Sequence, residues 1–182
     1  MHDICKFHSV HGSGIELDEA ESVARRCDDF CHGIVFSKKP LTVRQNVCLE
    51  VSHSLHQWSG GVLRVGVTSH NPAHMQSTAL PRFAIPALTS KPGYWACALN
   101  ELCTESSSDK VVVWLDGEGH LQVTVNSHPP GGHVLLSGLP LDNTPLWLML
   151  DVFGATTTVK VIPAGNIELF CGSRCIPTET CM

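Results

Sequence analysis

The chain has 182 residues, a length that fits one compact domain and leaves little room for a second hydrophobic core. Hydrophobic residues make up 43% of the chain and can supply that core, whereas charged residues make up only 16%, below the ~25% of an ordinary soluble domain. The net charge is −5 and no dense Lys/Arg stripe occurs, which excludes nucleic acid as a partner, because its binding depends on neutralising phosphates.

Cysteine usage and the N-terminus bear on the compartment. Nine cysteines are an odd number, so a complete set of disulfides would leave at least one of them unpaired. The first residues lack the basic stretch and apolar core of a secretory signal, and no segment is apolar for long enough to span a bilayer. We therefore expect a cytoplasmic protein with reduced thiols.

The N-terminal region is ambiguous between a helix and a strand. Within residues 15–26, Leu17, Ala20 and Val23 fall near helical spacing, and Asp18 could cap a helix. The alternative is a strand over residues 22–25, which we favour because the remainder of the chain is so uniformly β in character.

The middle of the chain shows the alternation that is typical of half-buried strands. Apolar and polar side chains alternate in residues 43–51, 63–68 and 121–126. Each run therefore predicts a strand with one buried face and one solvated face.

Two other runs, residues 111–115 and 146–150, are apolar at every position, which is typical of strands covered on both faces. We expect them to be core strands, with Trp114 and Trp147 in the core. Asp151 follows the second run and is the carboxylate expected to be buried. A buried charge needs a partner, and Arg64 on another core strand is the candidate.

The strands are separated by turn chemistry and not by helices. Asp116 and Gly117 predict a hairpin, and residues 129–132, Pro-Pro-Gly-Gly, predict another turn. Many short strands spaced by turns predict an all-β fold, a two-sheet antiparallel β-sandwich. We place this domain at residues 5–163 and expect residues 164–182 to be a poorly ordered tail that carries cysteines.

The sequence lacks the motifs of a catalytic or metal centre. It has no G-x-S-x-G elbow, H-E-x-x-H helix, Walker A loop or C-x-x-C pair. Cys171, Cys175 and Cys181 invite a zinc interpretation, as do Cys27 and Cys31, but zinc ligands usually come as close pairs from two places. We expect no metal, no cofactor and no catalytic residue in this chain.

Three runs, residues 33–40, 58–72 and 145–154, resemble the Neuralized homology repeat in their order and spacing. Shorter matches at the opening Phe7-His8, at Tyr94-Trp95-Ala96 and in the hairpin extend the resemblance from about residue 7 to residue 162. The resemblance implies a β-sandwich of SPRY-like architecture that serves as the recognition module of Neuralized-type E3 ubiquitin ligases or adaptors.

In that family the repeat binds a protein substrate or the cytoplasmic tail of a Notch ligand. The ligase chemistry lies in a separate RING or is recruited through a SOCS box. The residues after position 162 contain three cysteines and no histidine, whereas a RING needs eight Cys/His ligands. We therefore expect contact with the ubiquitin-conjugating machinery to depend on another segment or on a partner, and this chain to transfer no ubiquitin unaided.

A sandwich places binding residues on its loops, so the long connections over residues 52–61, 70–92 and 104–110 are the expected partner site. Tryptophan, tyrosine and arginine are enriched at binding hot spots. For each candidate, a role in covering the core is the alternative. The candidate partner-binding residues are Trp58, His70, Arg82 and Tyr94.

Two other function classes remain open. A small basic patch would suit phosphoinositides and a peripheral position at the plasma membrane or endosomes, although a solvated face explains the same charges. The other class is a metal- or thiol-dependent enzyme that uses the cysteines of the tail. The residues of the predicted patch are Arg25, Arg26, Lys38, Lys39 and Arg44.

Overall fold

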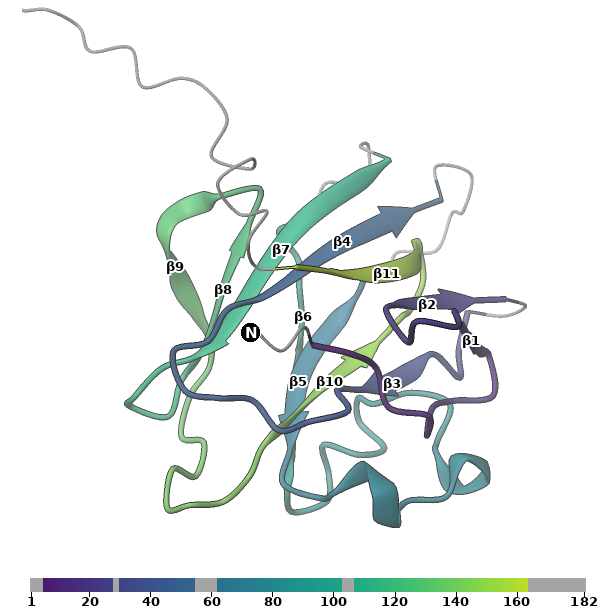
Figure 1. The fold of residues 1–182 in the computed structure, drawn as a ribbon, viewed down its shortest axis with the longest axis horizontal. Coiled ribbons are helices and arrows are strands. Elements are labelled where there is room, and N and C mark those ends of the chain that lie inside the picture. Colours follow the sequence, from purple (N-terminus) through teal and green to yellow (C-terminus); the bar gives the residue numbers. More distant parts are fainter. Residues whose placement is uncertain (1–4, 28–29, 55–61, 103–106, 164–182) are drawn as a thin grey trace, which may run out of the picture.

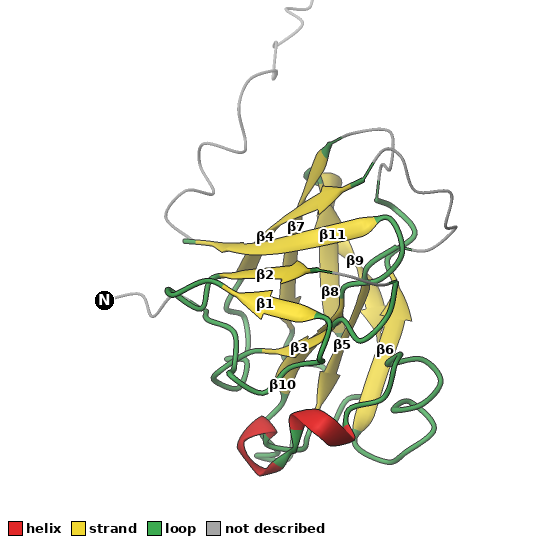
Figure 2. Ribbon diagram, turned by 90° about the vertical axis from the view of Figure 1, so that its right-hand side faces the viewer, coloured by secondary structure: helices red, strands yellow, loops and turns green. Residues whose placement is uncertain are grey.

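The computed structural model describes residues 5–27, 30–54, 62–102 and 107–163. These residues form eleven strands and two short 3-10 helices, and no α-helix. All strand pairs are antiparallel, and the strands make two sheets that face each other (Figures 1 and 2). The predicted all-β, two-sheet antiparallel sandwich is confirmed.

The larger sheet has seven strands in the order β1-β2-β11-β4-β7-β8-β9. Their bounds are β1 Ile15–Leu17, β2 Val23–Arg26, β4 Val47–His53, β7 Ser108–Leu115, β8 Leu121–Val125, β9 His128–Leu136 and β11 Thr156–Ile162. The smaller sheet has four strands in the order β3-β10-β5-β6. Their bounds are β3 Ile34–Phe36, β5 Arg64–Thr68, β6 Tyr94–Ala98 and β10 Trp147–Asp151.

Most of the predicted strands are present. The N-terminal region forms a β1–β2 hairpin, so the strand alternative is confirmed, and Asp18 accepts backbone hydrogen bonds from Ser22 and Val23 in the hairpin turn. The alternating runs correspond to β4, β5 and β8, and Asp116 and Gly117 lie in the turn between β7 and β8.

Three sequence predictions need correction. Strand β7 is not covered on both faces: Val111, Val113 and Leu115 are buried while the side chains between them are half-buried. Of the two apolar runs, only the one that forms β10 is therefore buried along its whole strand. Trp114 consequently lies outside the core. Its indole packs over Gly132, where an added Cβ would come within 2.3 Å of the ring.

The third correction concerns residues 129–132, which lie within β9 and do not form a turn. Proline cannot donate to a strand ladder, but β9 is the outermost strand of its sheet and pairs only with β8, so one side of it needs no donors. Gly131 and Gly132 have φ values of +80° and +77°, which glycine adopts without steric cost.

Two hydrophobic clusters hold the fold together. The main cluster fills the space between the sheets and includes Leu49, Val65, Leu121 and Leu148. The second lies on the other face of the four-stranded sheet, where Ala84 and Leu88 of the β5–β6 connection pack on strand residues that include Met149. The connection over residues 70–92 therefore covers part of the outer face of that sheet, and it carries the helices η1 Pro72–His74 and η2 Ser77–Ala79 (Figure 2).

The strand directions separate the three long connections. The β4–β5 and β6–β7 connections adjoin the Arg64 and Ala98 ends of the antiparallel pair β5–β6, whereas the β5–β6 connection joins the opposite ends, Thr68 and Tyr94. The predicted loop site is thus divided between two ends of the sandwich. Neither 3-10 helix of the described residues has the length or the apolar character to cross a membrane.

Candidate functional site: the outer face of the four-stranded sheet

Arg64 and Asp151 pair on the outer face of the four-stranded sheet. They stand opposite each other in the β5–β10 register, and Arg64 Nη1 donates to Asp151 Oδ2 at 3.2 Å. The Asp151 side chain is fully buried, while 18% of the Arg64 side chain is exposed. The pairing expected from the sequence is confirmed. The buried carboxylate of Asp151 holds the Arg64 guanidinium, while part of the Arg64 side chain stays exposed to solvent.

The environment of Asp151 is incompletely satisfied. Burial raises the pKa of its carboxyl group above the ordinary value, and the hydrogen bond from the Ala84 N–H and the nearby Arg64 charge act in the opposite direction. Oδ2 accepts from both groups, but Oδ1 has no hydrogen-bond partner among the described residues. Such an orphan acceptor is costly, so a site that tolerates it merits a functional explanation.

Two phenylalanines surround the Arg64 guanidinium. Its Cζ lies 4.2 Å from the ring centroid of Phe153 and 5.7 Å from that of Phe83, and the two rings meet edge to face at 5.5 Å. Arg82 approaches Phe83 at 5.7 Å. Both rings are half-buried. We call Arg64, Arg82, Phe83 and Phe153 the arginine–phenylalanine cluster.

His70 and Tyr94 meet on the same face, at the Tyr94 end of β6. Their rings stack at 4.8 Å, and a ring nitrogen of His70 lies 2.9 Å from the Pro92 carbonyl oxygen. Gly93, with φ +83°, allows this approach, since an added Cβ would lie 2.5 Å from His70 Nε2. Tyr94 also packs on the second hydrophobic cluster, so it supports the fold as well as the surface.

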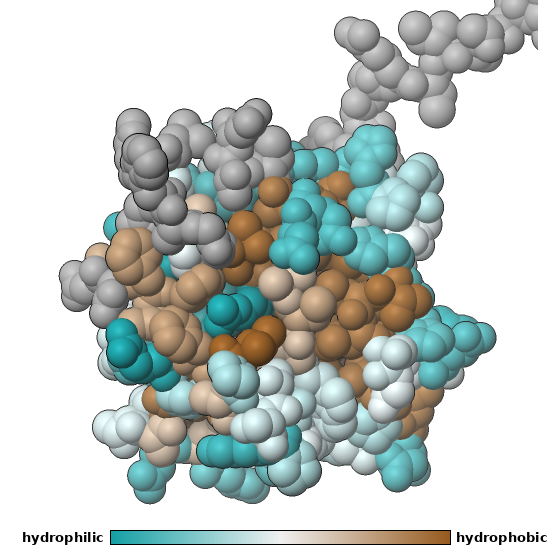
Figure 3. Space-filling view, turned by 180° about the vertical axis from the view of Figure 1, so that it is seen from behind, coloured by the Kyte–Doolittle hydropathy of each residue, from teal (hydrophilic) through white to brown (hydrophobic). Residues whose placement is uncertain are grey.

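The structure places three of the four predicted partner-binding residues on this face. His70 and Tyr94 are in contact, and Arg82 belongs to the arginine–phenylalanine cluster. Trp58 lies outside the described residues. Figure 3 views this side of the molecule, where hydrophobic residues, in brown, spread over much of the surface around hydrophilic patches in teal.

Sequence reasoning missed the two phenylalanines. Phe83 lies in the long β5–β6 connection and Phe153 follows β10, and no motif links positions 70 residues apart. Their meeting depends on the pairing of β5 with β10, which the sequence does not show. The expected Arg64–Asp151 pair was the one signal in the sequence that pointed to this part of the surface.

The predicted basic patch does not form as one surface. Arg26 is buried, with 8% exposure, and its guanidinium donates to the carbonyl oxygens of Val152 and Gly154. Arg25 on β2 pairs with Thr158 on β11, which in turn pairs with Ser52 near the C-terminal end of β4. Arg44 instead lies just before the N-terminal end of β4. Arg25 and Arg44 therefore belong to opposite ends of the seven-stranded sheet.

The two lysines of the predicted patch are exposed. Lys38 forms an ion pair with Glu21, so its charge is partly neutralised. Lys39 follows it in the chain. The remaining basic surface is thus smaller than the sequence suggested.

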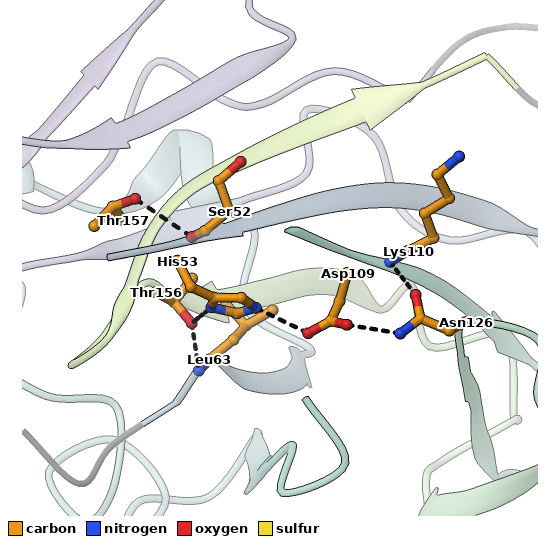
Figure 4. Close-up of polar contacts among 8 residues, drawn as sticks. All are labelled: Ser52, His53, Leu63, Asp109, Lys110, Asn126, Thr156 and Thr157. Carbon is orange, nitrogen blue, oxygen red and sulfur yellow. Dashed lines mark hydrogen bonds and ion pairs between the residues drawn. The ribbon is translucent and has the colours of Figure 1, made fainter. Parts of the chain in front are cut away.

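A Thr–His–Asp arrangement lies inside the sandwich (Figure 4). One His53 ring nitrogen is 2.9 Å from Asp109 Oδ2, the other is 3.4 Å from Thr156 Oγ1, and Asn126 donates to Asp109 Oδ1 at 2.6 Å. The order resembles a hydrolase triad. However, Thr156 and Asp109 are completely buried and the Thr156 hydroxyl accepts the Leu63 N–H, so no substrate can reach the oxygen. The arrangement is a structural network.

The described cysteines make no metal centre. Cys31 is buried and accepts a hydrogen bond from Arg82 at 3.5 Å, whereas Cys27 is exposed. No group of three or more His, Cys, Asp or Glu side chains within the described ranges is arranged to hold a metal ion. Cys171, Cys175 and Cys181 lie outside those ranges.

Comparison with known proteins gives one consistent family. The Neuralized family model matches residues 7–163. The chain is 33% identical over 157 residues to the protein neuralized of Drosophila melanogaster, a match that covers 86% of this chain and 20% of that protein. It is 36% identical over 159 residues to the human E3 ubiquitin-protein ligase NEURL3, covering 86% of this chain and 58% of that protein.

Solved structures agree with this result. The crystal structure of the Drosophila melanogaster neuralized NHR1 domain superposes with a TM-score of 0.80 at 29% identity, covering 89% of this chain and 99% of that one. The PSpry domain of TRIM65 superposes with a TM-score of 0.53 at 13% identity, covering 88% and 90%, and shows a shared fold alone. The expected SPRY-like architecture is confirmed.

Proposed function

The chain belongs to the Neuralized family, and we propose that it acts as the substrate-recognition domain of a Neuralized-type E3 ubiquitin ligase or adaptor. The chain spans 20% of the length of the fly relative and 58% of the length of human NEURL3. In this proposal the chain selects the protein to be modified, and ubiquitin transfer is performed by another segment or by a partner.

The arginine–phenylalanine cluster carries the proposal. Arginine and aromatic side chains are enriched at protein interfaces because they bury a large area, and arginine adds a charged group that can pair with a partner. Here the buried Asp151 fixes Arg64 in place, and the rings of Phe83 and Phe153 flank it, so the side chains are ordered before a partner arrives. A preorganised surface lowers the entropic cost of binding.

The proposed partner is a cytoplasmic segment of a substrate, such as a Notch-ligand tail, which is what the family resemblance implies. Arg64 and Arg82 are suited to a carboxylate of that segment, and the two phenylalanines to an apolar side chain beside it. Because both arginines lie on the outer face of the sheet, the segment would lie across this face and not inside the sandwich.

A peptide-binding assay tests the proposal. Synthetic peptides that tile the cytoplasmic tails of Notch ligands are titrated against the chain by fluorescence polarisation, with wild type compared with Phe153→Ala and Arg82→Ala. We expect at least one peptide to bind the wild type and each substitution to weaken binding by about tenfold or more, since a hot-spot truncation costs about 2 kcal/mol.

Thr124→Ala is the matched control, because Thr124 is half-buried and stands opposite Val112 in the β7–β8 pair, on the seven-stranded sheet. It should leave the affinity unchanged. Circular dichroism and thermal melts verify that each variant is folded. Unchanged affinity in folded Phe153→Ala and Arg82→Ala would move the binding site elsewhere, and no binding by any tail peptide would refute the Notch-ligand assignment.

A further inference from the structure

The four outer strands of the two sheets differ in how their free edges are protected. An uncovered edge exposes backbone N–H and C=O groups that can pair with another chain, and proteins usually block it with prolines, charges, short strands or a covering segment. Three of the four edges of this sandwich are blocked in one of these ways.

Each blocked edge uses its own device. Strand β1 has only three residues. The β9 edge carries Pro129 and Pro130. The β3 edge is covered by the N-terminal segment, because the His8 and Gly12 N–H groups donate to β3 at 2.8 Å each and Phe7 bridges to Ser37.

In the part of the chain that the structure describes, the edge of β6 has none of these devices. It is five residues long, Tyr94-Trp95-Ala96-Cys97-Ala98, and contains neither proline nor a charged side chain. Among the described residues only β5 pairs with it. We propose that this edge is a docking site for an extended segment of the protein partner, which adds to the four-stranded sheet as a further strand.

The hydrogen-bonding groups of β6 point the right way for this addition. The Leu99 N–H donates to Leu63, and the Ser69 N–H donates to Gly93. Hydrogen-bonded and non-hydrogen-bonded pairs alternate along an antiparallel ladder. The backbone N–H and C=O groups of Cys97 and Trp95 therefore face β5, as those of Leu99 and Gly93 do. The N–H and C=O groups of the intervening residues therefore face away from β5. These residues are Tyr94, Ala96 and Ala98.

The side chains beside the edge favour an apolar partner. All five residues of β6 are half-buried, including Trp95, which points toward the main core, whereas four of the five residues of the neighbouring β5 are buried. Strand β9 lies next to β6, and its Leu135 and Leu136 are also only partly buried against that core. An added strand would cover these half-buried side chains further.

These observations define the occupant by its chemistry. It is an extended segment of about five residues whose alternate side chains are apolar, because one face of the new strand covers the half-buried Trp95. Lys91, three residues before β6, is exposed and has no carboxylate within ion-pair distance among the described residues. An acidic residue at that end of the segment complements it.

The inference rests on the proposed recognition function and specifies its binding mode, so its test uses a probe that does not depend on Notch ligands. A phage-displayed library of random 12-residue peptides is selected on the wild-type chain, and the strongest binder is synthesised. Backbone amide exchange is then measured by NMR with and without the peptide. We expect the exchange of the Tyr94, Ala96 and Ala98 amides to slow by about tenfold or more, as for newly bonded groups.

Substitution at the edge separates backbone pairing from side-chain contact. Ala96→Pro removes an N–H that points away from β5, so it leaves the ladder within the sheet intact and should reduce peptide affinity by about tenfold or more. Ala96→Ser keeps the N–H and nearly the same volume, and should bind within about twofold of wild type. Ala98→Pro repeats the test should Ala96→Pro fail to fold.

Several results would overturn the inference. One is a peptide that binds folded Ala96→Pro as tightly as wild type, or that protects amides elsewhere. Another is failure to select any binding peptide. A third is a wild-type dimer, seen by analytical ultracentrifugation, that the Ala96→Pro variant lacks, because the edge would then pair with a second copy of the chain.

The two proposals fail separately. Tail peptides that bind wild type and Ala96→Pro equally would refute the edge and leave substrate recognition at the arginine–phenylalanine cluster. Library peptides that protect the β6 amides, together with no binding by any tail peptide, would support the edge and refute the Notch-ligand assignment.

Discussion

Asp109 and Asp151 are the two carboxylates buried in the described part of the molecule, and their surroundings differ. Asp109 bonds through both oxygens, one to the buried His53 and one to Asn126. Asp151 bonds through one oxygen, to Arg64 and Ala84, and the arginine that it holds reaches the surface. The first carboxylate serves the fold alone, whereas the second also orders a surface.

The largest effect is expected from Asp109→Ala, which leaves the buried His53 without its carboxylate partner. Removing one member of a buried pair costs about 3 to 5 kcal/mol, so the free energy of unfolding measured in urea should fall by that amount. Glu118→Ala, which removes a carboxylate whose side chain is 83% exposed, is the control and should leave the urea midpoint unchanged. A loss in Asp109→Ala no larger than in the control would show that the network does not support the fold.

Arg64→Ala should cost less stability, about 2 kcal/mol, even though it also leaves a buried carboxylate without its cation. The reason is that burial already raises the pKa of Asp151, so the carboxyl group can take up a proton and become neutral, and the Ala84 N–H remains bonded to it. Urea denaturation at neutral pH measures this value. A loss equal to that of Asp109→Ala would remove the distinction between the two carboxylates.

A smaller effect is expected in the pH dependence of stability. Because the folded-state pKa of Asp151 lies above the unfolded-state value, the native protein keeps this proton after the unfolded chain has released it. The contribution of Asp151 is therefore most favourable below the unfolded-state pKa and is lost as the pH rises through the folded-state pKa.

Asp151→Asn removes this titration. We expect the difference in unfolding free energy, wild type minus variant, to fall as the pH rises above the unfolded-state pKa, by about 1.4 kcal/mol for each pKa unit of the shift. Urea titrations at several pH values measure the difference. Parallel curves for the two proteins would show that burial does not raise the pKa of Asp151.

The smallest effect is expected at the surface. Lys38→Ala breaks the ion pair with Glu21, but both side chains are partly exposed, with 48% and 28% of their areas accessible. Water and salt screen such pairs, so we expect no resolvable shift of the urea midpoint at physiological ionic strength. A shift comparable to that of Arg64→Ala would contradict the ranking of buried over surface charges.

The sequence predicted the strands well where their two faces differ in polarity. In β4 and β8, alternation marked a buried and a less buried side, because only one side of each strand faces the main core. In β5 the expected solvated side was wrong, since Gly66 and Thr68 are buried as well. It was less informative in β7, where Val112 and Trp114 are apolar yet lie on the outer face. The residue type at position 114 cannot show that its indole packs against Gly132 of β9 and not in the core.

The partner site was only partly predictable for a related reason. His70, Arg82 and Tyr94 were chosen by residue type, and the structure places all three on the outer face of one sheet. The two phenylalanines gave no local signal. Arg26 was wrongly assigned to the surface, because its burial depends on hydrogen-bond partners that lie far from it in the sequence. Those partners are the carbonyl oxygens of Val152 and Gly154.

By itself, the sequence determined that this protein is an all-β sandwich, that Asp151 needs a partner and that the chain resembles the Neuralized family, because periodicity, turn chemistry and the cost of a buried charge act locally. The tertiary structure decided which residues share a surface and which strand edge is free. Both depend on strand order, and strand order is set by packing between segments that are distant in the chain.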